Sequence, residues 1–540
     1  MSIANCIDAY KADHRRQYPD DSETVFSNWT PRKSRVEEID KVMLLTLQVH
    51  VKRDLIDRWN NEFFRQPKAE VIAKYKRRIS NAGINISYDH MEALHDLGYL
   101  PIHIMSLPEG TMVPVGCPMF VMWNTHKDFA WVVNYLESKL SNAIWMGCTS
   151  ATTANWYREE IDYWIEMTGG DPTFVQWQGH DFSYRGMPGE EAAQSSGAGH
   201  LMSFTGSDTF PAADYLEDFY FADCEKELIL GSVVATEHSV MCMGGGGRFD
   251  IAHTPAKGLK VAHTEIKYTP GENLTDAEEE EEYNTFLRLI SVVYPDGIIS
   301  IVSDTWDYWK VITNYLPRLK NVIMARNGTV TIRPDSGDPV KIICGDPDAE
   351  VGSPEYKGSV QCLWDTFGGT ISPKGYQKLD SHINLIYGDS ITMKRCRQIC
   401  AGLVKKKFVP SIILGIGSYT YQYVTRDTYG FAMKATFGVV AGVPKLLFKD
   451  PKTDSGMKKS HRGLLAVFRD CNGEIFWKQE ATWEEVLDCE FRTVLLDSVA
   501  HNTQSLSEIR AIAAAQRADK VPDIEVLRAR YAAYEQSMAA

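Results

Sequence analysis

Five short apolar runs between residues 231 and 418 constrain the possible folds of this chain more than any other feature. Each run carries polar residues or glycine at its carboxyl end, and helical segments follow; the runs read GSVVATEHS, DGIISIVSDT, GTVTIRPDSG, HINLIYGDS and SIILGIGS. Parallel β/α units have this arrangement, with their functional groups on the loops at the carboxyl edge of the sheet. The pattern predicts an α/β protein with an irregular (β/α) barrel over residues 176–440.

The flanking segments predict a second, α+β domain packed on the barrel. Apolar residues recur at spacings of three and four over residues 37–165, which indicates helices, and the stretch LPIHIMSLPEGTMVPVGCPMFVMW within them predicts a small antiparallel sheet. We assign residues 1–175 to this domain and expect residues 441–540 to return to it before a helical tail. Residues 344–374 are rich in Gly, Pro and Asp and are interpreted as a long loop.

Composition excludes several classes of function. The 540 residues carry a formal net charge of -14, which disfavours a general nucleic-acid binder because that task needs basic surface. No stretch reaches the roughly 18 apolar residues of a membrane span, and the amino end lacks the apolar core of a signal peptide, so we expect a cytoplasmic protein. Eleven scattered cysteines favour reduced thiols, and Cys242 and Cys344 are expected to be structural.

Two strings predict a slot for a flat aromatic ring. In VTIRPDSGDP, Arg333 and Asp335 stand where a strand ends, and HDFSYRG combines Phe182 with Arg185. A bland turn would also use Pro-Asp-Ser-Gly, and Phe182 alone is more often a core residue. If Phe182 and Arg333 face each other, however, they offer ring stacking on one side and a guanidinium on the other. Such a slot suits a pyridine.

Other strand ends add carboxylates, a hydroxyl and an imidazole. Asp208 lies in GSDT, Ser300 and Asp304 in SIVSDTWD, and Glu237 and His238 in TEHS. Turn caps use the same residue types, so each is weak evidence alone and stronger if they converge on one face. His238 lies beside carboxylates, which is the setting of a phosphorylatable or proton-shuttling imidazole.

Glycine turns and a sparse basic series indicate phosphate binding. Turns with free backbone N–H groups can hold a phosphate, and local positive charge can capture a polyphosphate substrate in an acidic protein. A solvated surface would explain some of the cations equally well. The candidates are Gly388, Asp389, Gly417, Ser418, Arg426, Lys434, Lys449 and Lys459.

Eight ordered strings together resemble the nicotinamide phosphoribosyltransferases, which are type II phosphoribosyltransferases. They are HDFSYRG, GSDT, TEHS, SIVSDTWD, IRPDSGDP, YGDS, TRD and LLFKDP, and a further match lies in DAYKADHRRQYP. The resemblance implies synthesis of nicotinamide mononucleotide and pyrophosphate from nicotinamide and phosphoribosyl pyrophosphate, in NAD biosynthesis. It also implies Mg²⁺ bound with pyrophosphate and without a dedicated protein cage, ATP as an activating co-substrate, and a homodimer with shared active sites.

The resemblance assigns roles to the candidate residues. Phe182 and Arg333 would sandwich nicotinamide, and the partner subunit's Tyr10 would close the pocket. Asp208 and Ser300 would hold the carboxamide, because an aspartate accepts from an amide N–H and repels a carboxylate.

The remaining roles concern the sugar and the phosphates. Arg185 joins the substrate-binding group, and Asp335, Gly388 and Asp389 would hold the ribose hydroxyls. The 5′-phosphate would be held by Gly417, Ser418 and Arg426, and the pyrophosphate or the phosphates of ATP by Arg32, Lys434, Lys449 and Lys459. His238 would be phosphorylated by ATP, with Glu237 and Asp304 as its supports.

Two other functions fit the same fold, and the sequence departs from the family pattern at one glycine turn. A nicotinate phosphoribosyltransferase would share the fold, but it would call for a cation where Asp208 stands. A catalytically silent nucleotide-binding relative would have no chemical reason to keep the full set of site residues. Ser418 and Tyr419 stand where the family usually has glycines, so Tyr419 is expected to point away from the ligand.

Overall fold

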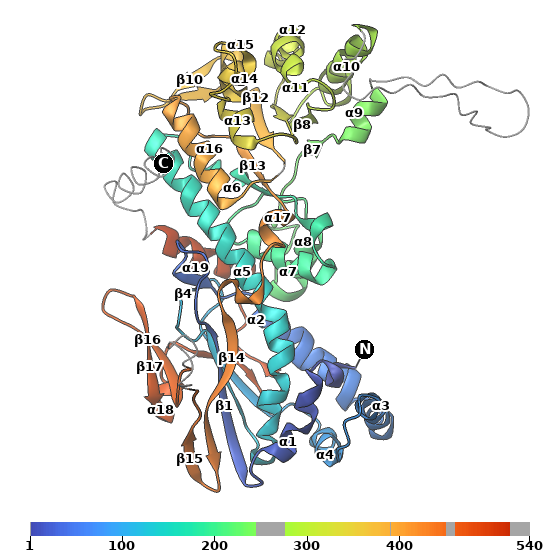
Figure 1. Cartoon of the computed structure of the whole chain (residues 1–540), viewed down its shortest axis with the longest axis vertical. Coiled ribbons are helices and arrows are strands. Elements are labelled where there is room, and N and C mark those ends of the chain that lie inside the picture. Colours follow the sequence, from blue (N-terminus) through green and yellow to red (C-terminus); the bar gives the residue numbers. More distant parts are fainter. Residues whose placement is uncertain (1, 245–275, 389, 450–459, 519–540) are drawn as a thin grey trace, which may run out of the picture.

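The arrangement of the chain was obtained as a computed structural model that describes residues 2–244, 276–388, 390–449 and 460–518. The molecule is elongated (Figure 1). A parallel sheet surrounded by helices occupies one end, an antiparallel sheet occupies the other, and the helix α5 (Trp131–Thr168) runs between them.

The parallel sheet has six strands and curls back on itself. Its order is β6-β13-β12-β9-β8-β7, which differs from the chain order. Isolated parallel bridges join Asp181 to Ser207 and Gly206 to Gly231, so the sheet continues from β6 towards the segment that leads into β7. The strands are β6 (Gly179–Asp181), β7 (Val234–Ala235), β8 (Ile299–Val302), β9 (Val330–Arg333), β12 (Ile383–Tyr387) and β13 (Ile413–Ile416). The prediction of an α/β fold with a barrel-like parallel sheet is confirmed.

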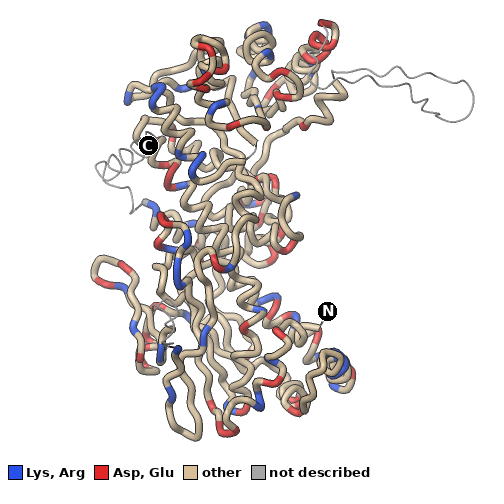
Figure 2. Tube along the Cα trace, in the orientation of Figure 1, with Lys and Arg blue, Asp and Glu red and all other residues tan. Residues whose placement is uncertain are grey.

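Burial and register explain why these apolar runs form neighbouring strands. Ile301 and Ile332 are fully buried and lie opposite each other in β8 and β9. The same register pairs Val302 with Arg333, so the two strands end at the same edge. Helices cover the outside of the sheet (Figure 1) and are α10 (Asp276–Arg288), α12 (Leu316–Met324), α13 (Pro339–Cys344), α15 (Ser359–Phe367) and α16 (Met393–Lys405). The acidic residues of α10 gather at its start, where they face the positive end of the helix dipole (Figure 2).

The antiparallel sheet joins distant parts of the chain. Its order is β15-β14-β1-β5-β3-β18-β19. The strands are β1 (Ser22–Pro31), β3 (Ile102–Ser106), β5 (Phe120–Asn124), β14 (Phe431–Val440), β15 (Val443–Leu446), β18 (Arg492–Leu496) and β19 (Val499–Ala500). Trp29 of β1 stacks on Phe120 at 6.2 Å and on Phe431 at 5.3 Å between ring centroids. The predicted small sheet is confirmed through β3 and β5, while the division into domains at residues 175 and 440 stays a prediction.

The helix α5 fixes the two sheets relative to each other. At a rise of about 1.5 Å per residue its 38 residues span about 57 Å. Its middle is buried on most sides, and it contacts α7 (Glu190–His200), α16, β1, β6 and β14. Trp145 and Trp156 of this helix each pack against both main hydrophobic cores. The two parts of the molecule are therefore joined by continuous packing.

Further helices and short strands complete the antiparallel end and the middle of the molecule. Near the amino end are η2 (Ala9–Asp13), α1 (His14–Gln17), β2 (Lys41–Met43), α2 (Leu47–His50), the π-helices η3 (Val51–Arg58) and η4 (Asn60–Phe64), α3 (Lys68–Asn81), α4 (Asp89–Leu97) and β4 (Met112–Pro114). Later segments are α8 (Pro211–Tyr220), α9 (His238–Gly244), β16 (Leu464–Arg469), β17 (Ile475–Ala481), α18 (Trp483–Leu487) and α19 (Leu506–Ala518). The predicted helical tail is confirmed as far as α19.

Two expectations from the sequence were wrong. The segment 344–374 is not one long loop, because it contains α14 (Pro354–Lys357), α15 and β10 (Gly369–Ile371). Val360, Leu363 and Phe367 of α15 are buried in the core of the parallel-sheet end, which the surrounding Gly and Pro residues conceal in the sequence. Both Cys242 and Cys344 were expected to be structural, but Cys242 is exposed near the end of α9, so its apolar neighbours in the sequence do not place it in a core; Cys344 is buried. In the described ranges, no helix is long and apolar enough to cross a membrane.

Candidate active site

Unpaired buried polar atoms concentrate at the carboxyl edge of the parallel sheet. Folded proteins pair nearly all buried polar groups, so such a concentration marks a place where other partners bind. Within the described part of the chain, the side-chain atoms here without a hydrogen-bond partner belong to Asp181, Ser183, Thr209, Ser300, Asp304, Thr305 and Arg333. They come from β6, β8 and β9, from the loops that follow these strands, and from the segment that follows the bridge at Ser207.

Phe182 and Arg333 lie on either side of two glycine-containing strand ends. A methyl group at Gly415 would come within 2.8 Å of the Phe182 ring and 2.9 Å of the Gly388 Cα atom. A methyl group at Gly388 would lie 3.7 Å from Arg333 Cδ and would collide with the Asp335 carboxylate. Glycine at both positions therefore lets the backbone approach the ring and the guanidinium closely. Phe182 follows β6 and Arg333 ends β9, with β13 and β12 between these two strands. That the two side chains sandwich a flat ring stays a prediction.

Arg333 is a partly buried cation surrounded by carboxylates. Its Nη2 donates to the Thr236 carbonyl oxygen at 2.6 Å. Burial lowers the pKa of the Arg333 guanidinium, and the charges of Asp335 and Asp208 act in the opposite direction. An arginine stays protonated in proteins under these conditions, so the edge keeps a fixed positive charge. Arg185, on the exposed turn η6 (Tyr184–Gly186), adds a second positive charge nearby.

Asp208 is held by two neighbouring donors. His180 Nε2 lies 3.1 Å from Asp208 Oδ1, and the Ser232 hydroxyl donates to the same oxygen. Burial alone would raise the pKa of the Asp208 carboxyl, but these hydrogen bonds and the Arg333 charge lower it below its ordinary value. Asp208 is therefore an ionised acceptor. The Ser300 hydroxyl is buried on β8 and has no partner among the described residues.

His238 lies opposite Asp304 at the start of α9. The His238 Nε2 atom is 3.3 Å from Asp304 Oδ1, and half of the histidine side chain is exposed while the aspartate is 4% exposed. The other oxygen of Asp304 accepts from the Asp335 N–H at 2.9 Å and from the Ser336 hydroxyl at 2.6 Å. Asp304 thus ties the imidazole to the turn that follows β9. Glu237 accepts from Ser239 in the described structure.

The glycine turn predicted to hold a phosphate opens towards solvent. A methyl group at Gly417 would meet nothing within 4 Å, and Ser418 begins the helix α17 (Ser418–Tyr421) with its side chain against Gly186. Tyr419 is 58% exposed and stacks on Tyr423 at 5.4 Å between ring centroids. That it points away from the ligand stays a prediction. Arg426 is half exposed in the nearby turn η9 (Arg426–Thr428), 3.4 Å from Asp427.

Four predicted residues lie with the antiparallel sheet. Tyr10 is 63% exposed in η2 and contacts the neighbouring His14 ring, and Lys434 of β14 lies 3.5 Å from Glu137. Arg32 follows β1 and donates to the Gly430 carbonyl oxygen, in the loop that begins with Arg426. Lys449 is exposed after β15. Asp389 and Lys459 lie outside the described residues, and the individual roles of all site residues stay predictions.

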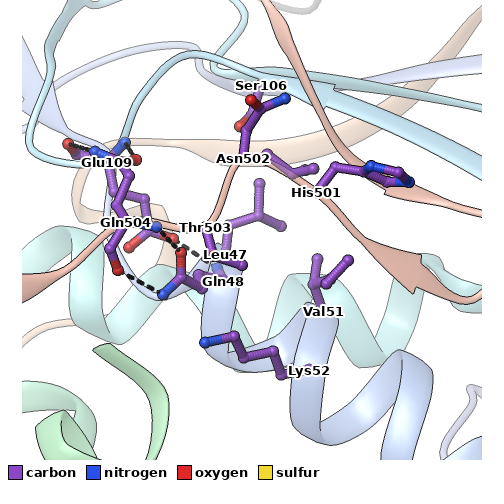
Figure 3. A pocket seen from close by; sticks show the side chains of 12 residues that line it. Leu47, Gln48, Val51, Lys52, Ser106, Glu109, His501, Asn502, Thr503 and Gln504 are labelled. Carbon is purple, nitrogen blue, oxygen red and sulfur yellow. Dashed lines mark hydrogen bonds between the residues drawn. The ribbon is translucent and has the colours of Figure 1, made fainter. Parts of the chain in front are cut away.

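A small hollow elsewhere does not compete with this site. It holds about 20 Å³ between α2, β3 and the segment after β19 (Figure 3), which is room for about one water molecule. Its polar groups pair with one another: the Gln48 side chain bonds with the Gln504 backbone, and Glu109 accepts from the Gln48 N–H at 2.6 Å. The hollow is therefore structural.

Sequence reasoning missed two contributors to the site, His180 and Ser232. His180 stands two residues before Phe182 in HDFSYRG, so its alternation with the ring on one strand was a usable signal. Ser232 left no such signal, because it reaches Asp208 only through the bridge between Gly206 and Gly231.

Comparison with known proteins identifies the family. The model of the nicotinate phosphoribosyltransferase (NAPRTase) family matches residues 177–488. The chain belongs to this family. A protein of Acinetobacter baylyi named nicotinamide phosphoribosyltransferase is 46% identical over 94% of this chain and 96% of its own length. A Mycoplasma genitalium protein of the same name is 28% identical over 85% of this chain and 96% of its own length.

Solved structures support the fold. A nicotinate-nucleotide pyrophosphorylase from Pyrococcus furiosus matches with a TM-score of 0.54 at 12% identity, covering 97% of both chains. The human nicotinic acid phosphoribosyltransferase matches with a TM-score of 0.51 at 14% identity, covering 94% of this chain and 93% of that chain. The type II phosphoribosyltransferase resemblance is confirmed, and the chain is a phosphoribosyltransferase of this family.

Proposed function

We propose that this enzyme transfers the phosphoribosyl group of phosphoribosyl pyrophosphate to nicotinamide, giving nicotinamide mononucleotide and pyrophosphate for NAD biosynthesis. The observation that carries the choice of base is the ionised Asp208 beside the Phe182 and Arg333 slot. The name of the Acinetobacter baylyi relative supports the same choice.

Asp208 favours an amide over an acid. Its Oδ1 is already occupied by His180 and Ser232, so Oδ2 is the oxygen left to accept from the carboxamide N–H. The buried Ser300 hydroxyl would supply a further hydrogen bond to the carboxamide. Nicotinate would bring a second negative charge to the same place and would be repelled. The pyridine ring itself would lie between Phe182 and Arg333.

The chemical step needs positioning more than covalent catalysis. As the bond from the anomeric carbon to pyrophosphate breaks, positive charge builds on the ribose while the pyridine nitrogen attacks in line. Asp335, packed against Gly388, would hold the ribose hydroxyls and stabilise this charge. Arg426 and the open turn at Gly417 would hold the 5′-phosphate.

Magnesium would enter with the pyrophosphate. The described residues hold no group of three or more side chains of the kind that bind a metal on their own, and Mg²⁺ commonly uses one or two carboxylates together with substrate phosphates. Asp335, at the turn that follows β9, would be one such carboxylate. When bound, the ion would neutralise charge on the leaving group.

ATP would act through His238. A ring nitrogen of His238 would attack the γ-phosphorus, the bond to the ADP oxygen would break, and ADP would leave. Asp304, which faces Nε2, would orient the ring and stabilise its positive charge. The half-exposed imidazole allows a nucleotide to reach it.

A homodimer would bring the remaining predicted residues to the site. The exposed Tyr10 ring and the Lys434 cation lie with the antiparallel sheet, so a second copy of the chain would supply them across a shared site. We also propose a cytoplasmic location, where phosphoribosyl pyrophosphate and ATP are available.

Product formation tests the reaction. Purified protein with Mg²⁺ and phosphoribosyl pyrophosphate is given nicotinamide or nicotinate, with and without ATP. Nicotinamide mononucleotide formed selectively and faster with ATP is the expected result. A preference for nicotinate would overturn the base assignment, and no turnover of either base would point to a silent relative.

Radiolabel from γ-labelled ATP tests the histidine separately. The wild-type protein should take up an acid-labile label, and His238→Ala should take up none. Label that persists in His238→Ala would place the phosphoryl group on another residue.

A further inference from the structure

His180 touches both elements that would recognise the base. The whole residue is buried, with 7% of its surface exposed. Its ring centroid lies 4.6 Å from that of Phe182 at an interplanar angle of 42°, and its Nε2 lies 3.1 Å from Asp208 Oδ1. Since an ionised carboxylate only accepts, Nε2 carries the hydrogen of this bond. The imidazole therefore connects the stacking ring to the acceptor.

The backbone fixes this contact. His180 lies in β6, and Phe182 follows the last residue of this strand, where its N–H donates to the Ile416 carbonyl oxygen at 3.0 Å. Residues two apart in extended chain point to the same face. Asp181 N–H donates to the Gly206 carbonyl oxygen at 3.1 Å, and Asp208 N–H donates to the Asp181 carbonyl oxygen at 3.0 Å. A methyl group at Gly206 would come within 2.8 Å of His180 Nδ1, so glycine there leaves room for the imidazole.

The two oxygens of Asp208 are used differently. His180 and Ser232 both bond to Oδ1, and across the described ranges Oδ2 receives no hydrogen bond, while 41% of the side chain is exposed. A carboxylate without the His180 bond could rotate and present either oxygen, or turn towards the Arg333 cation. The imidazole holds the carboxylate in one orientation.

We propose that His180 is a specificity-determining residue of the base site, which orients the Asp208 carboxylate so that one oxygen faces the carboxamide of the substrate. The inference rests on the proposed function. It assigns His180 a positioning role, because the imidazole acts through Asp208 and not on the reacting atoms.

The test compares two substitutions at His180 in the full-length enzyme. His180→Leu removes the donor and keeps an apolar side chain beside Phe182, whereas His180→Gln keeps a donor near the position of Nε2. We expect His180→Leu to raise KM for nicotinamide about tenfold, the effect of losing a hydrogen bond to a charged group. Its kcat and its KM for phosphoribosyl pyrophosphate should change less than twofold, and its preference for nicotinamide over nicotinate should fall. His180→Gln should restore most of the loss.

His382→Leu is the matched control. His382 also pairs with an aspartate, Asp380, at 2.6 Å, but it precedes β12 and so lies at the opposite edge of the parallel sheet. This variant should keep both KM values. Far-UV circular dichroism and thermal unfolding establish that each variant is folded.

The outcomes separate the two proposals. Unchanged selectivity and KM in a folded His180→Leu would overturn the positioning role while leaving the proposed function in place. An equal loss in His180→Leu and His180→Gln would overturn it as well, because the donor would then not be the cause. A wild-type enzyme that does not use nicotinamide would overturn the proposed function, and the inference with it, before any variant is measured.

Discussion

Two His–Asp pairs lie in different parts of the molecule and differ in their exposure to solvent. We call the pair of His50 and Asp54 the sealed pair, and the pair of His180 and Asp208 the open pair. His50 and Asp54, between α2 and η3, are 2% and 1% exposed, and the Asp54 carboxylate also contacts Arg53, Arg58 and Lys139 at 3.1 to 3.4 Å. His180 and Asp208, at the edge of the parallel sheet, are 9% and 41% exposed. In the first pair both oxygens of the carboxylate have partners, whereas in the second pair the described residues contact one oxygen and leave the other without a hydrogen bond.

The difference separates stability from recognition. The buried Asp54 carboxylate contacts cations from η3 and α5 and so links these two helices. Both of its oxygens have partners, so neither can accept a hydrogen bond from a ligand. A carboxylate bound on one oxygen is oriented and remains available on the other. Removing Asp54 should therefore affect folding, and removing residues of the open site should affect catalysis or choice of substrate.

The largest effect is expected for Asp54→Asn. Breaking a buried ion pair leaves the facing cations without compensation, which costs about 3–5 kcal/mol of the free energy of unfolding. Urea unfolding at pH 7 should show a lower midpoint, while kcat of the folded protein should remain within twofold. A midpoint equal to that of the wild type would show that the sealed pair does not stabilise the fold.

The pH dependence of this effect has a defined sign. Burial alone would raise the pKa of Asp54, but the His50 hydrogen bond and the Lys139 and Arg53 charges hold it far below its ordinary value. A lowered pKa contributes stability above the unfolded pKa of about 4 and loses it as the pH falls below that value. The difference between wild type and Asp54→Asn should therefore shrink in acid.

Arg333→Ala should lower activity and leave stability nearly unchanged, the reverse of Asp54→Asn. Losing one wall of the base slot would leave the pyridine ring poorly positioned for in-line attack, and it is expected to lower kcat/KM by about 100-fold. The free energy of unfolding should change by about 1 kcal/mol or less, since Arg333 makes one backbone hydrogen bond. Arg318→Ala, which removes an exposed arginine paired with Glu280 on the outer helices, is the control. Activity retained in Arg333→Ala would remove this residue from the site.

Asp208→Asn tests recognition alone. The amide keeps the shape of the side chain and removes its charge, so nicotinate should no longer be repelled. We expect the ratio of kcat/KM for nicotinate to that for nicotinamide to rise about 10- to 100-fold. Competition between the two bases measures this ratio directly, and an unchanged ratio would contradict the charge-based filter.

The sequence predicted the candidate active site better than it predicted the sealed pair of His50 and Asp54. Arg333, Asp335, His238 and Asp304 stand at the ends of recognisable strands, and parallel strands bring such ends to one edge. The predicted slot followed from this rule. His50 and Asp54 are four residues apart in a helical segment, but their partner Lys139 lies 85 residues further on, and only tertiary packing places it there.

Local composition also misled the interpretation of residues 344–374. The helix α15 is short, and Gly358 and Gly368 at its two ends both have positive φ, so the glycines that suggested a loop in fact bound a helix. The apolar spacing of SVQCLWDTF carried the correct signal. His180 was missed for a related reason, because its partner Asp208 is reached through an isolated bridge and not through a strand that the pattern could reveal.

Glu282 of α10 gives the smallest and most specific test, because it combines the burial of the sealed pair with the incomplete pairing of the open one. It is 2% exposed, Tyr315 donates to one of its oxygens at 3.0 Å, and burial raises its pKa to about 7. A raised pKa contributes stability below the unfolded pKa of about 4.3 that is lost as the pH rises to about 7. Glu282→Gln keeps the acceptor for Tyr315 and cannot ionise, so relative to wild type it should gain about 1–2 kcal/mol in the free energy of unfolding between pH 5 and pH 7. The exposed Glu280→Gln on the same helix should show no such gain. Parallel stability curves for wild type and Glu282→Gln would mean that burial does not raise the pKa of the Glu282 carboxyl.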